Sequence, residues 1–83
     1  MIVYEKRCFA ILIKHGRGVM RRLMTEETAT LIKTFGGAAV LSGYDQTKYI
    51  ACIVFEYKVA RDHFAVNMER RGFTFDTRDD ALI

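Results

Sequence analysis

The sequence lacks tryptophan and proline, and it contains a single serine, Ser42. Because proline is absent, the sequence contains no proline-rich ligand tail and no stiff proline-rich linker. No apolar run approaches the ~18 residues that a membrane-spanning helix requires, so we expect a cytoplasmic protein with no membrane partner. The two cysteines, Cys8 and Cys52, are not part of a CxxC pair. Two such residues make no disulfide framework, and we expect both to be buried thiols.

The motifs of catalysis and metal binding are also missing. The sequence contains no nucleophilic serine motif, no dinucleotide-binding glycine fingerprint and no pair of carboxylates spaced for acid–base chemistry. No HxH or HxxxH spacing joins His15 or His63 to further metal ligands. A thiol inside an apolar strand is a poor nucleophile, because burial raises its pKa. We therefore expect a protein that is not an enzyme, with no catalytic residue, no metal and no cofactor.

The chain does contain enough apolar material for one folded domain over residues 1–83. Hydrophobic residues make up 51% of the sequence and charged residues 28%, close to the average of globular proteins. A domain of this size buries about 60–65% of the surface of its unfolded chain. This composition predicts a folded chain rather than a disordered one.

Apolar runs and turn signals divide the chain into strands and helices. The patterns predict strands over residues 8–14, 38–44, 48–57 and 73–75, and helices over residues 25–35 and 58–71. Thr25, followed by two glutamates, is typical of a helix N-cap with carboxylates in the first turn. The pair Gly36-Gly37 and the single Gly72 are typical of helix ends. The polar tail from Asp76 is predicted to be frayed.

Residues 19–24 have two interpretations. We favour a strand that returns from the turn at His15–Gly18 and forms a hairpin; the alternative is one helix from Val19 to Phe35. The hairpin gives two ββα units in tandem, and the helix gives the ferredoxin-like βαββαβ order. Both predict an α+β fold, with a single antiparallel-rich sheet of four to five strands and two helices on one face.

Neither of the two most apolar strands has a polar face, so the face without helices is predicted to expose apolar side chains. Along these strands the charged Lys14 and Glu56 fall on the same face as the aliphatic side chains. We therefore place the aliphatic side chains on the face without helices. That sheet-face interface consists of Ala10, Leu12, Ile50, Cys52 and Val54. The opposite phase would expose an aromatic platform on which unpaired bases stack, made of Phe9, Tyr49, Phe55 and Tyr57.

The charges are unevenly distributed along a chain of net charge +3. No acidic residue lies between Glu5 and Glu26, and this interval holds a basic segment that contains Lys14, Arg17, Arg21 and Arg22. These cations predict contact with phosphates or with an acidic protein surface, and the neighbouring glycines allow a close backbone approach.

The sequence favours a small non-enzymatic binding or regulatory protein that acts through protein–protein contacts. We expect a homodimer, a complex with a larger target protein, or both. Small domains of this kind are often inhibitors or accessory regulators, including phage-encoded ones. The alternative is a nucleic-acid-binding module that uses the basic segment Lys14–Arg22.

Overall fold

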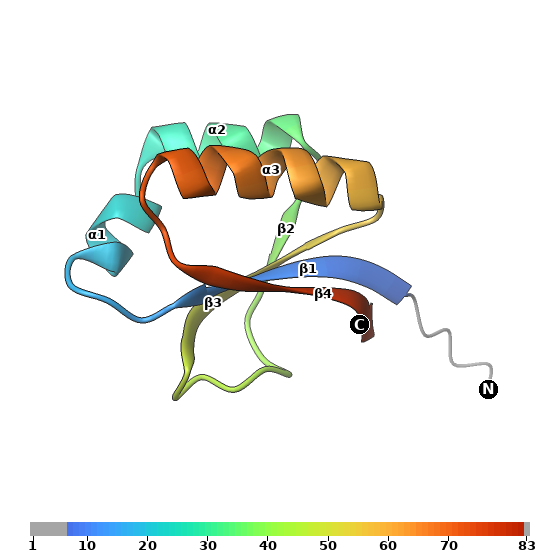
Figure 1. Ribbon diagram of the computed structural model, residues 1–83, viewed down its shortest axis with the longest axis horizontal. Coiled ribbons are helices and arrows are strands. Elements are labelled where there is room, and N and C mark those ends of the chain that lie inside the picture. Colours follow the sequence, from blue (N-terminus) through green and yellow to red (C-terminus); the bar gives the residue numbers. More distant parts are fainter. Residues whose placement is uncertain (1–6, 83) are drawn as a thin grey trace.

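Four antiparallel strands form one open sheet in the order β2-β3-β1-β4, and the helices lie on one side of it (Figure 1). The computed structural model describes residues 7–82. In chain order the elements are β1 (Arg7–Lys14), α1 (Val19–Leu23), α2 (Glu26–Thr34), β2 (Ala38–Val40), β3 (Tyr49–Phe55), α3 (Lys58–Arg70) and β4 (Phe75–Leu82). The predicted α+β class, with a single antiparallel sheet, is confirmed.

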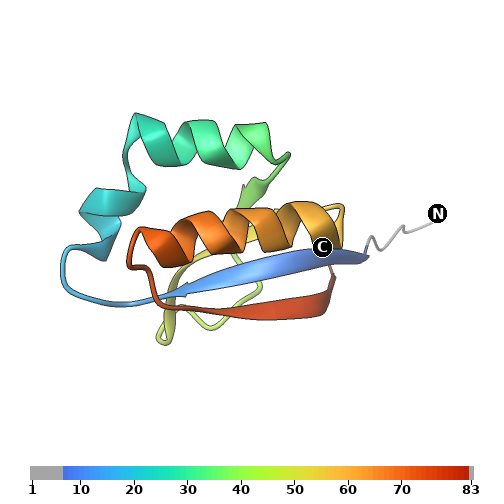
Figure 2. The ribbon, with the colours of Figure 1, turned by 45° about the horizontal axis from the view of Figure 1, so that its top comes forward.

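Residues 19–24 do not form the favoured hairpin strand. Val19–Leu23 form α1, a separate short helix between the end of β1 and the start of α2, and Met24 is its C-cap (Figure 2). The reason lies in the sheet, because β1 already has β3 on one edge and β4 on the other. Gly18, at a φ of 70°, turns the chain away from the sheet before α1 begins. The alternative of one continuous helix is also wrong, since Thr25 is extended and starts α2 afresh.

The predicted ends of α2 are confirmed. The Thr25 side chain accepts a hydrogen bond from the Thr28 backbone amide at 3.2 Å. At the other end Gly36 adopts a φ of 72°, and the Gly37 amide donates to the Ile32 carbonyl at 2.7 Å. This is the geometry of a glycine-terminated helix.

The predictions for the two edge strands are wrong in length. β2 stops at Val40 rather than Tyr44, and β4 runs from Phe75 to Leu82 where a frayed polar tail was expected after a strand at residues 73–75. An edge strand needs few apolar side chains. β4 pairs with β1 from Phe75 to Leu82, and polar side-chain contacts add to this pairing. The Tyr49 hydroxyl donates to the Asp76 carboxylate at 2.5 Å, and Arg61 donates to Asp79 at 2.6 Å.

The core has two parts, one on each face of the sheet. On the helix side, Ile11 and Phe55 pack against Phe64 and Met68 of α3. On the other side lie Ala10, Leu12, Cys52 and Val54, as the aliphatic-outward phase predicts. The aromatic-outward alternative is wrong for Phe55, and Tyr49 alone of that set joins the helix-free face.

Ile50 is an exception to the predicted phase. In the pairing of β1 with β3, Ile13 lies opposite Ala51 and Lys14 opposite Tyr49, so Ile50 is an extra residue in β3. A bulge of this kind reverses the side-chain alternation. Ile50 therefore packs against the helix-side core, and its predicted place on the helix-free face is wrong.

No helix within residues 7–82 is long and apolar enough to cross a membrane.

Candidate functional site: an apolar groove and an arginine cluster

The helix-free face of the sheet is covered rather than exposed. The connection between β2 and β3, residues 41–48, hangs below the sheet (Figure 1), and its Tyr44 packs on the apolar cluster of that face. Ala10, Leu12, Cys52 and Val54 are consequently only 1–7% exposed. Four of the five residues of the predicted sheet-face interface are therefore covered, and the fifth, Ile50, lies on the helix side of the sheet.

Asp45 holds the covering loop in shape. Its carboxylate accepts hydrogen bonds from the Thr47 amide and hydroxyl, and its carbonyl accepts from the Tyr49 amide. These bonds from Thr47 lower the pKa of the Asp45 carboxyl. His15 bonds the Gln46 carbonyl at 2.9 Å, which joins the turn after β1 to the same loop. These hydrogen bonds hold the loop in a defined conformation against the sheet.

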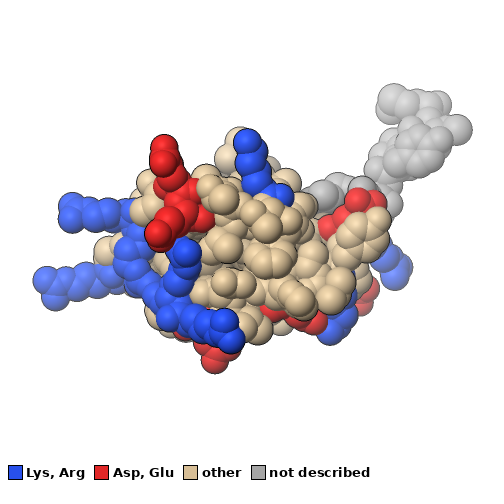
Figure 3. Space-filling view, turned by 90° about the horizontal axis from the view of Figure 1, so that it is seen from above, with Lys and Arg blue, Asp and Glu red and all other residues tan. Residues whose placement is uncertain are grey.

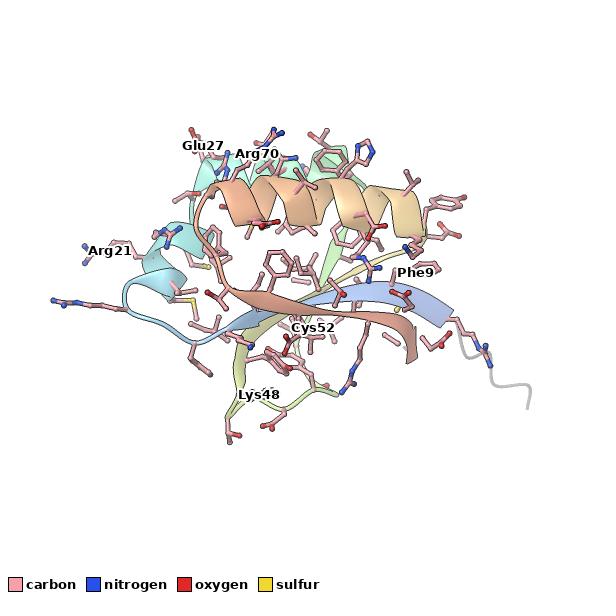
Figure 4. The ribbon with its side chains drawn as sticks, viewed as in Figure 1. Phe9, Arg21, Glu27, Lys48, Cys52 and Arg70 are labelled. Carbon is pink, nitrogen blue, oxygen red and sulfur yellow. The ribbon has the colours of Figure 1, made fainter. Side chains whose placement is uncertain are left out.

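A cavity of about 190 Å³ remains between this loop and the sheet, with Cys52, Arg78 and Asp80 in its lining. Figure 4 shows Cys52 on the side of the sheet away from the helices. Burial raises the pKa of the Cys52 thiol, which leaves it protonated and unreactive at neutral pH. Cys8 donates from its own thiol to the Ala81 carbonyl at 3.3 Å. Both cysteines are buried thiols, as predicted.

Neither histidine lies in a metal-binding cluster. His63 is on the outer side of α3, where its ring meets Phe35 edge-on at a centroid distance of 6.1 Å. Within the described part of the chain, no three His, Cys, Asp or Glu side chains come together in a way that could hold a metal ion.

An apolar groove of about 230 Å³ opens between the helices and the β2 edge of the sheet. Its helix wall comes from α1 and α2, its floor from β3, and its outer rim from β2 and the residue after it. The lining residues include Met20, Leu23, Met24, Ile32, Val40, Leu41, Ile50 and Ala51. Three of these are among the most exposed large apolar side chains that the structure describes: Leu41 at 89%, Met24 at 78% and Met20 at 51%.

The groove stays open because β2 is short. β2 pairs only with residues 52–54 of β3, ending at the pair Val40–Cys52. Beyond that pair the chain leaves the sheet as the covering loop, so the outer edge of β3 from Tyr49 to Ala51 has no strand beside it among the described residues. Sequence reasoning missed this site, although Met20 and Met24 stand one helical turn apart, a spacing that places both on one face.

The predicted basic segment is divided by the fold. Lys14 lies at the end of β1 and pairs with Asp76 at 3.6 Å. Arg17, Arg21 and Arg22 lie in the turn after β1 and on α1, and all three are exposed. The structure thus keeps three of the four cations together and assigns Lys14 to an ion pair within the sheet.

Two further arginines join these three from a distant part of the sequence. Arg70 and Arg71 end α3, and the Arg22 side chain donates a hydrogen bond to the Arg71 carbonyl. Figure 3 shows Lys and Arg side chains gathered at this end of the molecule. We call Arg17, Arg21, Arg22, Arg70 and Arg71 the arginine cluster. In the sequence, Arg70 and Arg71 are explained as favourable charges at the C-terminal end of a helix. No sequence signal indicates that they lie near Arg17, Arg21 and Arg22.

No protein-family model, no curated protein and no solved structure is significantly similar to this chain.

Proposed function

We propose that this chain is a non-enzymatic binding protein that receives an extended segment of a partner protein in the apolar groove beside β2. The observation that carries the proposal is the convergence of Met20, Met24 and Leu41, all largely exposed, on one groove. Scattered single apolar side chains are normal on a protein surface, whereas a contiguous apolar patch marks an interaction site.

The neighbouring backbone favours an extended occupant. β2 is an edge strand, and Ile50 and Ala51, on the part of β3 beyond the end of β2, lie in the groove floor. An added strand can bond to such an edge with its backbone, while alternate side chains enter the apolar groove. Methionine side chains adapt to ligands of different shape, so Met20 and Met24 suit the helix wall of this site.

The charges around the groove favour an acidic partner. Among the residues that line it, none is charged. Three cations are direct sequence neighbours of lining residues, namely Arg21, Arg22 and Lys33, and two acidic residues are, namely Glu27 and Asp45. Arg21 and Arg22 both lie on α1, which gives that end of the groove a basic character. A segment with an apolar centre and acidic flanks would match both the groove and its basic end.

Methionine methyl signals in NMR spectra provide a direct test. We expect a short peptide of alternating valine and threonine with glutamates at both ends to shift the Met20 and Met24 methyl signals. Met68 is fully buried in the core and serves as an internal reference that should not move. Leu41→Asp should weaken the binding by about tenfold, which corresponds to about 1.4 kcal/mol and is a typical loss when apolar contact is removed.

Val66→Asp is the matched control, because Val66 is also exposed but lies on α3 away from the groove. It should leave the affinity unchanged. Equal binding of a peptide with lysines in place of the glutamates would contradict the acidic partner. Peptide binding that Leu41→Asp does not alter would contradict the groove itself. If Leu41→Asp instead converts a dimer into a monomer in sedimentation, the occupant is a second copy of the chain.

We further infer that the sheet has the ferredoxin-like arrangement. In support, β3 lies between β1 and β2, and β1 lies between β3 and β4, so each strand–helix–strand unit is split by a strand of the other. We also propose that the protein acts in the cytoplasm as a regulator or inhibitor, since a small binding domain acts by occupying its partner's surface.

A further inference from the structure

We propose that the arginine cluster is a second binding site, next to the α1 wall of the groove, that contacts the phosphate backbone of a nucleic acid. Its members come from two parts of the chain, residues 17–22 and residues 70–71. Figure 4 shows Arg21 and Arg70, each projecting outward from the molecule. Neither part alone has more than three arginines, so the site exists only in the folded protein.

Arg22 joins the two parts. Its guanidinium lies 4.3 Å from the centroid of the Phe73 ring, and it donates a hydrogen bond to the Arg71 carbonyl. A guanidinium stacked on an aromatic ring is held in place without losing its charge. Arg22 is therefore a positioning residue that fixes α1 against the C-terminal end of α3.

Most of the cluster's charge is available to a ligand. Arg71 pairs with Glu27 of α2 at 3.2 Å, and Glu26 lies beside Glu27 on the same first turn. By contrast, none of the ion pairs within residues 7–82 includes Arg17, Arg21 or Arg70. Arg22 has no carboxylate partner there either. These side chains are free to form charge-assisted bonds with phosphate oxygens.

The chemistry of the cluster favours phosphates over an acidic protein. A protein interface gains most of its affinity from buried aromatic and apolar anchors. Here the neighbouring aromatic ring, Phe73, is itself buried beneath Arg22, and the exposed Met20 and Met24 line the groove. An arginine guanidinium can bind two phosphate oxygens at once. Gly16 and Gly18, on either side of Arg17, have no side chains, so the phosphate backbone of a nucleic acid can approach this turn closely.

This site has no evident means of reading bases. α1 has five residues and presents arginine rather than a set of mixed hydrogen-bonding side chains. Binding should therefore be independent of sequence and strongly dependent on salt. Each phosphate contact contributes about −0.9 to the slope of log K against log salt on duplex DNA. Arg22 is held by Phe73 and the Arg71 carbonyl, so the other three arginines without an ion pair among the described residues, Arg17, Arg21 and Arg70, give a slope of about −2.7.

Fluorescence anisotropy with a labelled duplex DNA, over a series of salt concentrations, tests the proposal. We expect the measured slope to lose about one unit for each of Arg17→Gln, Arg21→Gln and Arg70→Gln. Arg7→Gln is the charge-matched control, because Arg7 is exposed and lies at the opposite end of β1 from the turn. It should change the slope much less. Circular dichroism would establish that each variant is folded.

Three results would overturn the site. One is no binding of duplex DNA or single-stranded RNA at low salt. Another is an equal loss of binding from Arg7→Gln, which would mean that only net charge matters. The third is arginine-dependent binding of polyglutamate without binding of nucleic acid, which would assign the cluster to an acidic protein. Because Leu41→Asp leaves these arginines untouched, it should preserve DNA binding, and the two proposals can fail separately.

Discussion

At the scale of single residues, Gly37 shows how closely α2 and the sheet are joined. A Cβ atom built on Gly37 would lie 2.6 Å from Cε2 and 2.8 Å from Cζ of Phe55. Phe55 is buried in the helix-side core and cannot move aside without disturbing its neighbours. The glycine is required here for space, whereas the neighbouring Gly36 is suited to its positive φ.

Gly37→Ala should therefore lower the free energy of unfolding by about 1–3 kcal/mol, the usual range for overpacking. The measurement is urea unfolding of four proteins: wild type, Gly37→Ala, Phe55→Leu and the double variant. Removing the ring should relieve the clash, so Gly37→Ala should cost less when residue 55 is already leucine. The same cost in both backgrounds would mean that the contact with Phe55 is not the cause.

At the scale of elements, Arg61 joins α3 to the two strands on the β4 side of the sheet. Its side chain is 97% buried, and it donates to the Ala10 carbonyl of β1 and the Arg78 carbonyl of β4, at 3.2 and 3.0 Å. It also donates to the carboxylates of Asp62 and Asp79, at 2.8 and 2.6 Å. The hydrogen bonds and ion pairs of Arg61 thus help to hold β4, which has few apolar side chains of its own.

Arg61→Met should lower the free energy of unfolding by about 2–4 kcal/mol, because it leaves buried acceptors unsatisfied and removes the partner of two carboxylates. Arg61→Lys should recover only part of this loss, since an ammonium cannot make the same set of planar bonds. Hydrogen exchange of the β4 amides measures the local effect, which should exceed the effect on β3. Uniform faster exchange in all strands would contradict a specific role at β4.

The elements that could be predicted are those with a local signal. The apolar strands β1 and β3 and the glycine-terminated helices α2 and α3 are predicted within a few residues of their ends. β4 was missed because its stability comes from Arg61 and Tyr49, which lie elsewhere in the sequence. α1 was misassigned because local pattern does not reveal that β4 occupies the edge of β1.

The same reasoning applies to the candidate sites. The charges of Arg17, Arg21 and Arg22 were visible in the sequence, but their meeting with Arg70 and Arg71 depends on how α3 is packed. The apolar groove depends on β2 stopping at Val40, and the sequence AAVLSGY gives no reason to stop there. Exposure is a property of the whole fold, so an apolar residue at the surface cannot be distinguished from a core residue by its local pattern.

At the scale of the whole molecule, the described features are two proposed binding regions and one covered face. The groove is apolar and lies along the β2 edge, while the arginine cluster is charged and lies at the joint of α1 and α3. The face without helices is closed by the loop at residues 41–48. We therefore expect binding to occur at the β2 edge and at the α1 end of the molecule rather than on the helix-free face of the sheet.

Stability should also respond to pH as a property of the whole molecule. The pKa values of Asp45, Asp62 and Asp76 are all lowered, chiefly by hydrogen bonds to their carboxylates. For Asp76 the main cause is the Tyr49 hydroxyl, and the positive charge of Lys14 adds to it. A carboxyl whose pKa is lower in the folded state stabilises the fold above its unfolded pKa, about 3.9 for Asp. That contribution is lost as the pH falls through the folded pKa.

Asp76→Asn should accordingly destabilise the protein at pH 7, and its effect should shrink as the pH falls below the unfolded pKa of about 3.9, because the stabilisation from the lowered pKa is then lost. Urea unfolding at a series of pH values measures the difference between the two proteins. Asp80→Asn is the control. Asp80 is also on β4, but its side chain is highly exposed and its ion pair with Arg7 is long, at 3.9 Å. If Asp76→Asn costs the same stability at every pH, the loss comes from the geometry of the Tyr49 bond and not from the charge it stabilises.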